Sequence, residues 1–115
     1  MALSYADKAN IEKGVVTGTA ISLQETIGAA IRDIGGLILK NTITLASIPN
    51  NTGITQAGLN ECALRMSRGG LQQELIAHVL ADPSVTTGTP SDANIQGAVT
   101  YAIWPIALLI TTGKM

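Results

Sequence analysis

The stretch that decides the fold is ANIQGAVTYAIWPIALLITTG, residues 93–113, which lies between Asp92 and Lys114. It contains no Asp, Glu, Lys, Arg or His. Its length is close to the ~20 helical residues that cross a bilayer. In a chain of 115 residues, such a segment has to enter the core of the chain itself, the surface of a partner, or a membrane.

Apolar side chains recur in this stretch at helical spacing, which predicts an apolar C-terminal helix over residues 91–112. The main apolar face consists of Ile95, Val99, Ala102, Ile106 and Leu109. Polar residues within the stretch, and the lack of a basic flank except Lys114, disfavour a membrane span. We therefore expect this helix to pack in the core or in a subunit interface. Membrane insertion and docking of a tail on a partner are the alternatives.

Trp104 and Pro105 are adjacent residues near the middle of this helix. Trp104 is the only tryptophan, and we expect it to anchor the core or an interface. Pro105 has no amide hydrogen to donate, so we expect it to kink or break the helix after Ile103 or Trp104.

A long amphipathic helix is predicted from Ser22 onward. Ser22 and Glu25 have the spacing of a capping box, in which the two side chains satisfy free amide groups at a helix start. Apolar residues then follow at helical intervals: Leu23, Ile27, Ala30, Ile34 and Leu37. We expect one helix over residues 22–48, although residues 41–48 also fit a strand.

Glycines are unusual inside such a helix, because each costs about 1 kcal/mol relative to alanine. Gly28 and Gly35 are seven residues apart and therefore lie near one face. One interpretation is a groove that another helix approaches closely. The other is a tolerated weakness, or a break in the helix at Gly35 and Gly36.

The rest of the chain completes a mostly α domain. Residues 55–82 are expected to form a helix, a Gly69-Gly70 stop and a second helix, with Thr55 as the first N-cap. Residues 1–21 are expected to form an N-terminal arm with a short helix, and residues 15–21 are a connector or a short strand. We predict a single domain, 1–115, folded as a compact helical bundle.

The composition favours association. Hydrophobic residues make up 46% of the chain and charged residues 13%, compared with about 25% charged in an average soluble domain. A small domain has a large surface for its volume, and this chain has too few charged residues to occupy much of that surface. This favours a homo-oligomer or a place in a larger assembly, where part of the surface is covered. The alternative is a soluble monomer with a hydroxyl-rich surface.

The charge pattern and the N-terminus exclude other classes. The Lys and Arg residues are scattered, and Arg65 and Arg68 are their only close pair, so we expect no nucleic-acid binding. The N-terminal residues lack the features of a signal peptide, so we expect synthesis in the cytoplasm.

No pattern of catalytic or metal-binding residues is present. Cys62 is the only cysteine, which excludes an internal disulfide, and His78 is the only histidine. A hydrolytic triad would need His78 with Cys62 or a serine, and a zinc site would need a second ligand at suitable spacing. The glycines form no phosphate-binding loop. We predict no catalytic, cofactor-binding or metal-binding residue, no cofactor, and no enzyme activity.

The chain resembles the small structural proteins of tailed-phage virions. The features that carry this resemblance are the start Met1-Ala-Leu-Ser-Tyr5, the loops at 49–53 and 83–90, and the aliphatic core without Phe. The resemblance is one of composition over the whole length, and it assigns a role to no residue. Decoration and tail-tube proteins are commonly β-rich, so the helical pattern here implies an adaptor or a helical accessory component, located in the virion.

These observations together predict a non-enzymatic assembly protein that self-associates or docks with other structural proteins. A small membrane-active protein and a soluble partner-binding module are the alternative classes. The candidate interface residues are Gly28, Gly35, Ile95, Val99, Trp104, Ile106 and Leu109.

Overall fold

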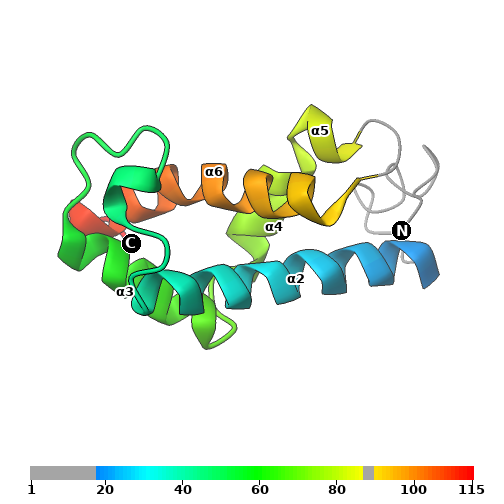
Figure 1. Ribbon diagram of the computed structural model, residues 1–115, viewed down its shortest axis with the longest axis horizontal. Coiled ribbons are helices and arrows are strands. Elements are labelled where there is room, and N and C mark those ends of the chain that lie inside the picture. The colour runs from blue at the N-terminus through cyan, green and yellow to red at the C-terminus, as the bar shows by residue number, and fades with distance from the viewer. Residues whose placement is uncertain (1–17, 87–89) are drawn as a thin grey trace.

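The computed structural model describes residues 18–86 and 90–115 of the chain (Figure 1). Its elements are α2 (Gly18–Leu39), the 3-10 turn η1 (Leu45–Ser47), α3 (Gln56–Ser67), α4 (Gln72–Leu80), α5 (Pro83–Thr86) and α6 (Asp92–Thr111). The described residues contain no strand, so the prediction of a mostly α bundle with an apolar C-terminal helix is confirmed. The short helix expected in the N-terminal arm lies outside the described residues.

The two long helices lie side by side and point in the same direction (Figure 1). α2 and α6 both run along the long axis of a molecule that measures 40 × 26 × 23 Å. α3 and α4 each pack against both of them. One end of the molecule is therefore built from the C-terminal ends of α2 and α6 together with the start of α3.

The core lies between these four helices and is made of aliphatic side chains. α2 contributes a buried row at helical spacing: Leu23, Ile27, Ala30, Ile31, Ile34 and Ile38. The row continues through Ile38, and Leu37, which was expected to face inward, is 37% exposed. Leu37 and Ile38 point about 100° apart on the helix, and at this turn the core contacts the side of α2 on which Ile38 lies.

The bounds of α2 differ from the predicted range of 22–48. The helix begins at Gly18, so Ser22 lies inside it and does not cap its start. It ends at Leu39, and Asn41 follows in the left-handed conformation with φ 61°. The amides of Asn41 and Thr42 donate to the carbonyls of Ile38 (3.0 Å) and Leu37 (2.9 Å). This is a Schellman motif, and it ends the helix because the chain turns away from the helix axis at the left-handed residue.

Residues 41–48 are therefore neither a helix extension nor a strand. They form a loop with the short turn η1, and Asn51 Nδ2 donates to the carbonyl oxygen of Leu45 at 2.8 Å. The buried side chains of Ile48 and Ile54 attach the loop to the core.

α3 and α4 have well-defined ends. Thr55 Oγ1 accepts a hydrogen bond from the amide of Gly58 at 3.0 Å, as expected of an N-cap. Gly69, with φ 86°, ends α3 by a second Schellman motif, in which the amide of Gly70 donates to the carbonyl of Arg65 at 2.8 Å.

α6 is continuous through Pro105, so of the two predicted effects, a kink or a break, the break does not occur. Pro105 removes the donor for the carbonyl of Tyr101, and the side chain of Tyr101 is 55% exposed. On that face, water can replace the missing donor. The opposite face of the same turns holds Ile103 and Ile106 in the core, which stabilises the helix on both sides of the proline.

Candidate functional site

The glycine face of α2 is filled by helices of the same chain. A Cβ atom added to Gly35 would lie 2.8 Å from the carbonyl oxygen of Ala63 and 2.9 Å from both Met66 Cβ and Ser67 N. These distances are shorter than ordinary van der Waals contact, so α3 approaches α2 this closely only because residue 35 has no side chain. Gly35 is thus a point of close helix contact, and its partner helix is α3.

Gly28 lies against α4. The side chain of Gln72 covers it, and Gln72 Nε2 donates to the carbonyl oxygen of Gly28 at 3.4 Å. Both glycines of the predicted groove therefore contact other helices of the same chain, and Gly28 also lines a shallow pocket of about 330 Å³ beside Gln72 and Ile76.

The five interface candidates on α6 fall into two groups. Ile95, Val99 and Ile106 are at most 4% exposed and belong to the core. Trp104 is half-buried, and Leu109 is 38% exposed. In the structure of the single chain, only Trp104 and Leu109 keep surface for contact with another molecule.

Exposed apolar side chains gather at one end of the bundle. Among the described residues, five large apolar side chains are more than a third exposed: Leu37, Leu39, Tyr101, Leu109 and Met115. All but Tyr101 belong to the last turn of α2, or to the last turn of α6 and the residues that follow it. Figure 1 shows these two helix ends at the same end of the molecule.

We call this end the terminal face and define it as Leu39, Lys40, Leu109, Lys114 and Met115. Lys40 and Lys114 are exposed; Lys40 follows directly on the end of α2, and Lys114 lies three residues after the end of α6. Leu39 and Met115 were missed in the sequence analysis, because Leu37 was assigned to the core-facing row and α2 was extended past residue 39. The helix-ending residues Asn41 and Gly113 were the signals that could have located this end.

Beside Met115, a shallow groove of about 330 Å³ separates α3 from the end of α6. Its lining includes Glu61 and Arg65, which form an ion pair with 3.0 Å between Oε1 and Nε. The groove extends the exposed surface at this end of the bundle towards α3.

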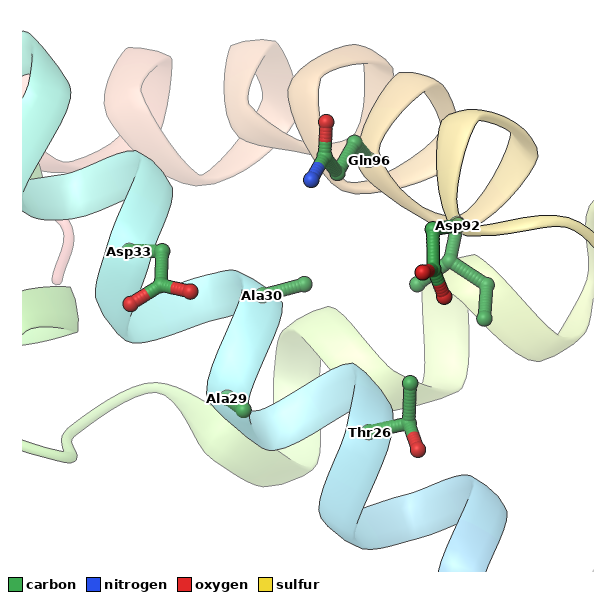
Figure 2. A pocket seen from close by; sticks show the side chains of 7 residues that line it. Thr26, Ala29, Ala30, Asp33, Asp92 and Gln96 are labelled. Atoms are coloured by element: carbon green, nitrogen blue, oxygen red, sulfur yellow. The ribbon is translucent and has the colours of Figure 1, made fainter.

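A second feature is a cavity of about 190 Å³ between α2 and α6. Figure 2 shows its side chains on facing stretches of the two helices. The lining residues are Thr26, Ala29, Ala30, Asp33, Asp92, Ile95 and Gln96. We call this cavity the acidic groove, because its lining includes two carboxylates and no Lys or Arg.

The electrostatics of the acidic groove favour a cation. Asp33 and Asp92 are both exposed, and neither forms an ion pair with any described residue. Asp92 also stabilises the start of α6, where the free amide groups carry partial positive charge. The exposed Ala29 gives the groove an apolar component, whereas Ala30 and Ile95 are buried beside it. The lining contains no nucleophile and no histidine, so the arrangement is suited to binding.

The two groups that could take part in nucleophilic chemistry, Cys62 and His78, lie in different environments on different helices. Cys62 is fully buried, and burial raises the pKa of its thiol to about 12, against a smaller opposite effect of Arg65. The thiol is therefore protonated at neutral pH and is not a nucleophile. His78 is exposed on α4. Within the described ranges, no three His, Cys, Asp or Glu side chains are grouped so as to hold a metal ion.

Comparisons of the chain with models of protein families, with curated proteins and with solved structures find no match. By length and apolar composition, α6 is the one helix in the described part of the chain that is able to cross a membrane. The core helix of a soluble protein has the same properties, so this finding alone is weak evidence for a membrane span.

Proposed function

We propose that this protein is a non-enzymatic assembly protein, which self-associates or docks into a larger complex. The observation that carries the proposal is the terminal face, where Leu39, Leu109 and Met115 are 43%, 38% and 38% exposed. Single exposed apolar residues are ordinary on soluble proteins. Their concentration at one end of a small bundle is typical of a surface that is covered in a complex.

The low charge of the chain supports the same proposal. The chain has eight acidic and seven basic residues among 115, so most of its surface carries no ionised group. Covering such a surface removes few charges from water, and the free-energy penalty of desolvation is correspondingly small. Each apolar Å² that is covered contributes about 25 cal/mol in favour of association.

A virion is the setting that the compositional resemblance to tailed-phage structural proteins suggests. The helical fold fits an adaptor or an accessory component of a particle, whose copies occupy fixed positions against each other or against other structural proteins.

Membrane insertion of α6 is the second candidate, and the length and composition of that helix favour it. Insertion would require α6 to leave its packing against α2, α3 and α4. Ile95, Val99, Ile103 and Ile106 would then exchange the core for lipid. The energetic difference between the two environments is small for these side chains, but the other helices would lose their core.

The experiment that tests the proposal is size-exclusion chromatography with light scattering, in buffer without detergent and over a hundredfold range of protein concentration. A discrete multimer, or a mass that rises with concentration, supports self-association. A monomer at every concentration contradicts self-association and leaves docking to a different protein. Loss of the protein as aggregates that detergent dissolves would favour the membrane-active alternative.

A further inference from the structure

The shallow pocket beside Gly28 lies between α2 and α4 and has a volume of about 330 Å³. We call it the α2–α4 pocket and define it by its lining residues: Gln24, Glu25, Gly28, Arg32, Gln72 and Ile76. The first four belong to α2 and the last two to α4. None of them belongs to the terminal face or to the lining of the acidic groove.

The pocket has one negative and one positive side chain on its α2 wall. Glu25 and Arg32 are exposed and are seven residues apart on α2, so they lie on the same side of the helix, about 10 Å apart along its axis. Neither forms an ion pair with any described residue. The guanidinium of Arg32 lies against the turn between α3 and α4, because a Cβ atom added to Gly69 would be 3.6 Å from its Nε and Nη2 atoms. Both charges are therefore available to a second molecule.

The middle of the pocket carries no charge. Gly28 lies between the two charged residues in the sequence, and the side chain of Gln72 covers it, with Nε2 donating to the carbonyl oxygen of Gly28 at 3.4 Å. The half-buried Ile76 adds apolar surface one turn further along α4. A side-chain amide has both donors and an acceptor, so Gln72 is able to pair with another amide as well. The middle of the pocket can thus contact a surface of its own kind.

The order of the charges selects the partner. A nucleic acid, an anionic membrane or an acidic peptide would place negative charge against Glu25, and a basic partner would place positive charge against Arg32. The surface that matches both residues carries the same two charges in the reverse order. A second copy of the pocket, turned by 180°, is such a surface.

We propose that two copies of this chain associate through their α2–α4 pockets, about a two-fold axis near Gly28 and with the two α2 helices antiparallel. Glu25 of each copy lies against Arg32 of its partner, and Gln72 and Ile76 of the two copies meet beside the axis. The inference rests on the proposed function and specifies its partner as a second copy of the chain. The terminal face stays free to dock with a different protein.

The antiparallel arrangement follows from the positions of the charges along α2. Glu25 is three residues before Gly28 and Arg32 is four residues after it, so a two-fold axis near Gly28 places each residue opposite the other. A parallel arrangement would instead place Glu25 against Glu25. The symmetry gives two Glu–Arg pairs per dimer. Because exposed ion pairs are individually weak, we expect a dimer that dissociates on dilution and in high salt.

Charge reversal tests the contact with three variants: Glu25→Arg, Arg32→Glu, and the double variant that carries both changes. Each single change replaces two attractive pairs per dimer by two repulsive pairs. The double variant reverses the order of the charges and so restores both attractive pairs. Both positions are exposed, so the variants are expected to fold, and far-UV circular dichroism checks this.

Each single variant has a control with the same change in net charge. Asp33→Arg matches Glu25→Arg, and Lys114→Glu matches Arg32→Glu. Both control positions are exposed and lie outside the α2–α4 pocket. Asp33 lines the acidic groove and Lys114 belongs to the terminal face, so the controls also report whether those surfaces take part in self-association.

Sedimentation velocity of the full chain at 50 mM NaCl provides the readout. We expect each single variant to associate at least tenfold more weakly than the wild-type protein, and the double variant and both controls to associate within about threefold of it. A 1:1 mixture of the two single variants should form a heterodimer, because the doubly positive pocket of one faces the doubly negative pocket of the other. In the wild-type protein, 500 mM NaCl should weaken association several-fold.

The possible results separate this inference from the proposed function. A wild-type protein that is monomeric at all concentrations overturns the two-fold contact and leaves docking to a different protein as the proposed function. A wild-type multimer that persists in both single variants overturns only the two-fold contact, because the copies then associate through another surface. The same holds if a control weakens association as much as its matched variant, or if the mixture of the two single variants forms no dimer.

Discussion

The close contact between α2 and α3 can be tested with two neighbouring glycines. A Cβ atom at Gly35 would lie within 2.9 Å of three atoms of α3, whereas a Cβ atom at Gly36 would have no other atom within 4 Å. Both residues are inside α2, so Gly→Ala raises helix propensity by about 1 kcal/mol at each position. The difference between the two variants therefore isolates the steric effect of the added methyl group.

The magnitude follows from the atoms that the methyl group would meet. Overpacking a helix contact lowers the free energy of unfolding by about 1–3 kcal/mol. Two of the three atoms near Gly35, the carbonyl oxygen of Ala63 and the amide nitrogen of Ser67, belong to the backbone and cannot rotate away. We therefore expect Gly35→Ala to be about 1.5–3 kcal/mol less stable than Gly36→Ala. Relative to wild type, Gly36→Ala should gain about 0.5–1 kcal/mol and Gly35→Ala should lose about 1–2 kcal/mol.

The assay is urea unfolding followed by circular dichroism at 222 nm, at one protein concentration for all three proteins, since any association shifts apparent stability. With a slope of about 1.5 kcal/mol per M urea, the midpoints of the two variants should differ by roughly 1–2 M. Equal midpoints within about 0.2 M, or a Gly35→Ala variant more stable than wild type, would refute the close approach of α3 to α2 at residue 35.

Three further predictions concern other positions. Gly69→Ala should lose about 1–2 kcal/mol of stability, because residue 69 has φ 86° and a side chain is strained there. Gly97→Ala is the control, because residue 97 lies inside α6 with open space around it. This variant should gain about 0.5–1 kcal/mol of stability, and equal thermal midpoints of the two variants would contradict the prediction. Burial raises the pKa of the Cys62 thiol to about 12 in the folded protein, whereas an unfolded thiol has a pKa of about 8.5. The contribution of Cys62 to the free energy of unfolding is therefore complete below pH ~8.5 and falls as the pH rises above that value, by roughly 2 kcal/mol at pH 10. The urea midpoints at pH 8 and pH 10 should therefore differ less in Cys62→Ala than in the wild type. An equal fall of the midpoint in both proteins would exclude Cys62 as the source of the pH dependence. The half-buried Trp104 should emit at a shorter wavelength in native buffer than in urea, and a native spectrum already like that of free tryptophan would show that α6 is not packed as described.

Local patterns identified the helix caps that depend on a few neighbouring residues. Thr55, which was expected as an N-cap, caps α3, where its Oγ1 accepts from the amide of Gly58 at 3.0 Å. Such caps need only a side-chain oxygen and an amide three residues later, so the sequence is sufficient to find them. The Ser22–Glu25 pattern shows the limit of this reasoning, because a capping box permits a helix to start but does not prevent one from starting earlier.

The candidate site was less accessible to sequence reasoning. The periodicity of α6 identified Ile95, Val99 and Ile106 as an apolar face, but the same periodicity fits a core and an interface equally well. The acidic groove joins Asp33 to Asp92, which are 59 residues apart, and no local pattern connects them.

By itself, the sequence determined the class of fold, the apolar C-terminal helix and the scarcity of charge, because these depend on composition and on the 3.6-residue period of a helix. The tertiary structure alone decided that Gly35 serves contact with α3, that Leu37 and Leu39 lie outside the core, and that Asn41 ends α2. Each of these depends on which helix packs against which face of its neighbour. That choice is made by contacts between residues far apart in the chain, and a single sequence does not contain them as a pattern.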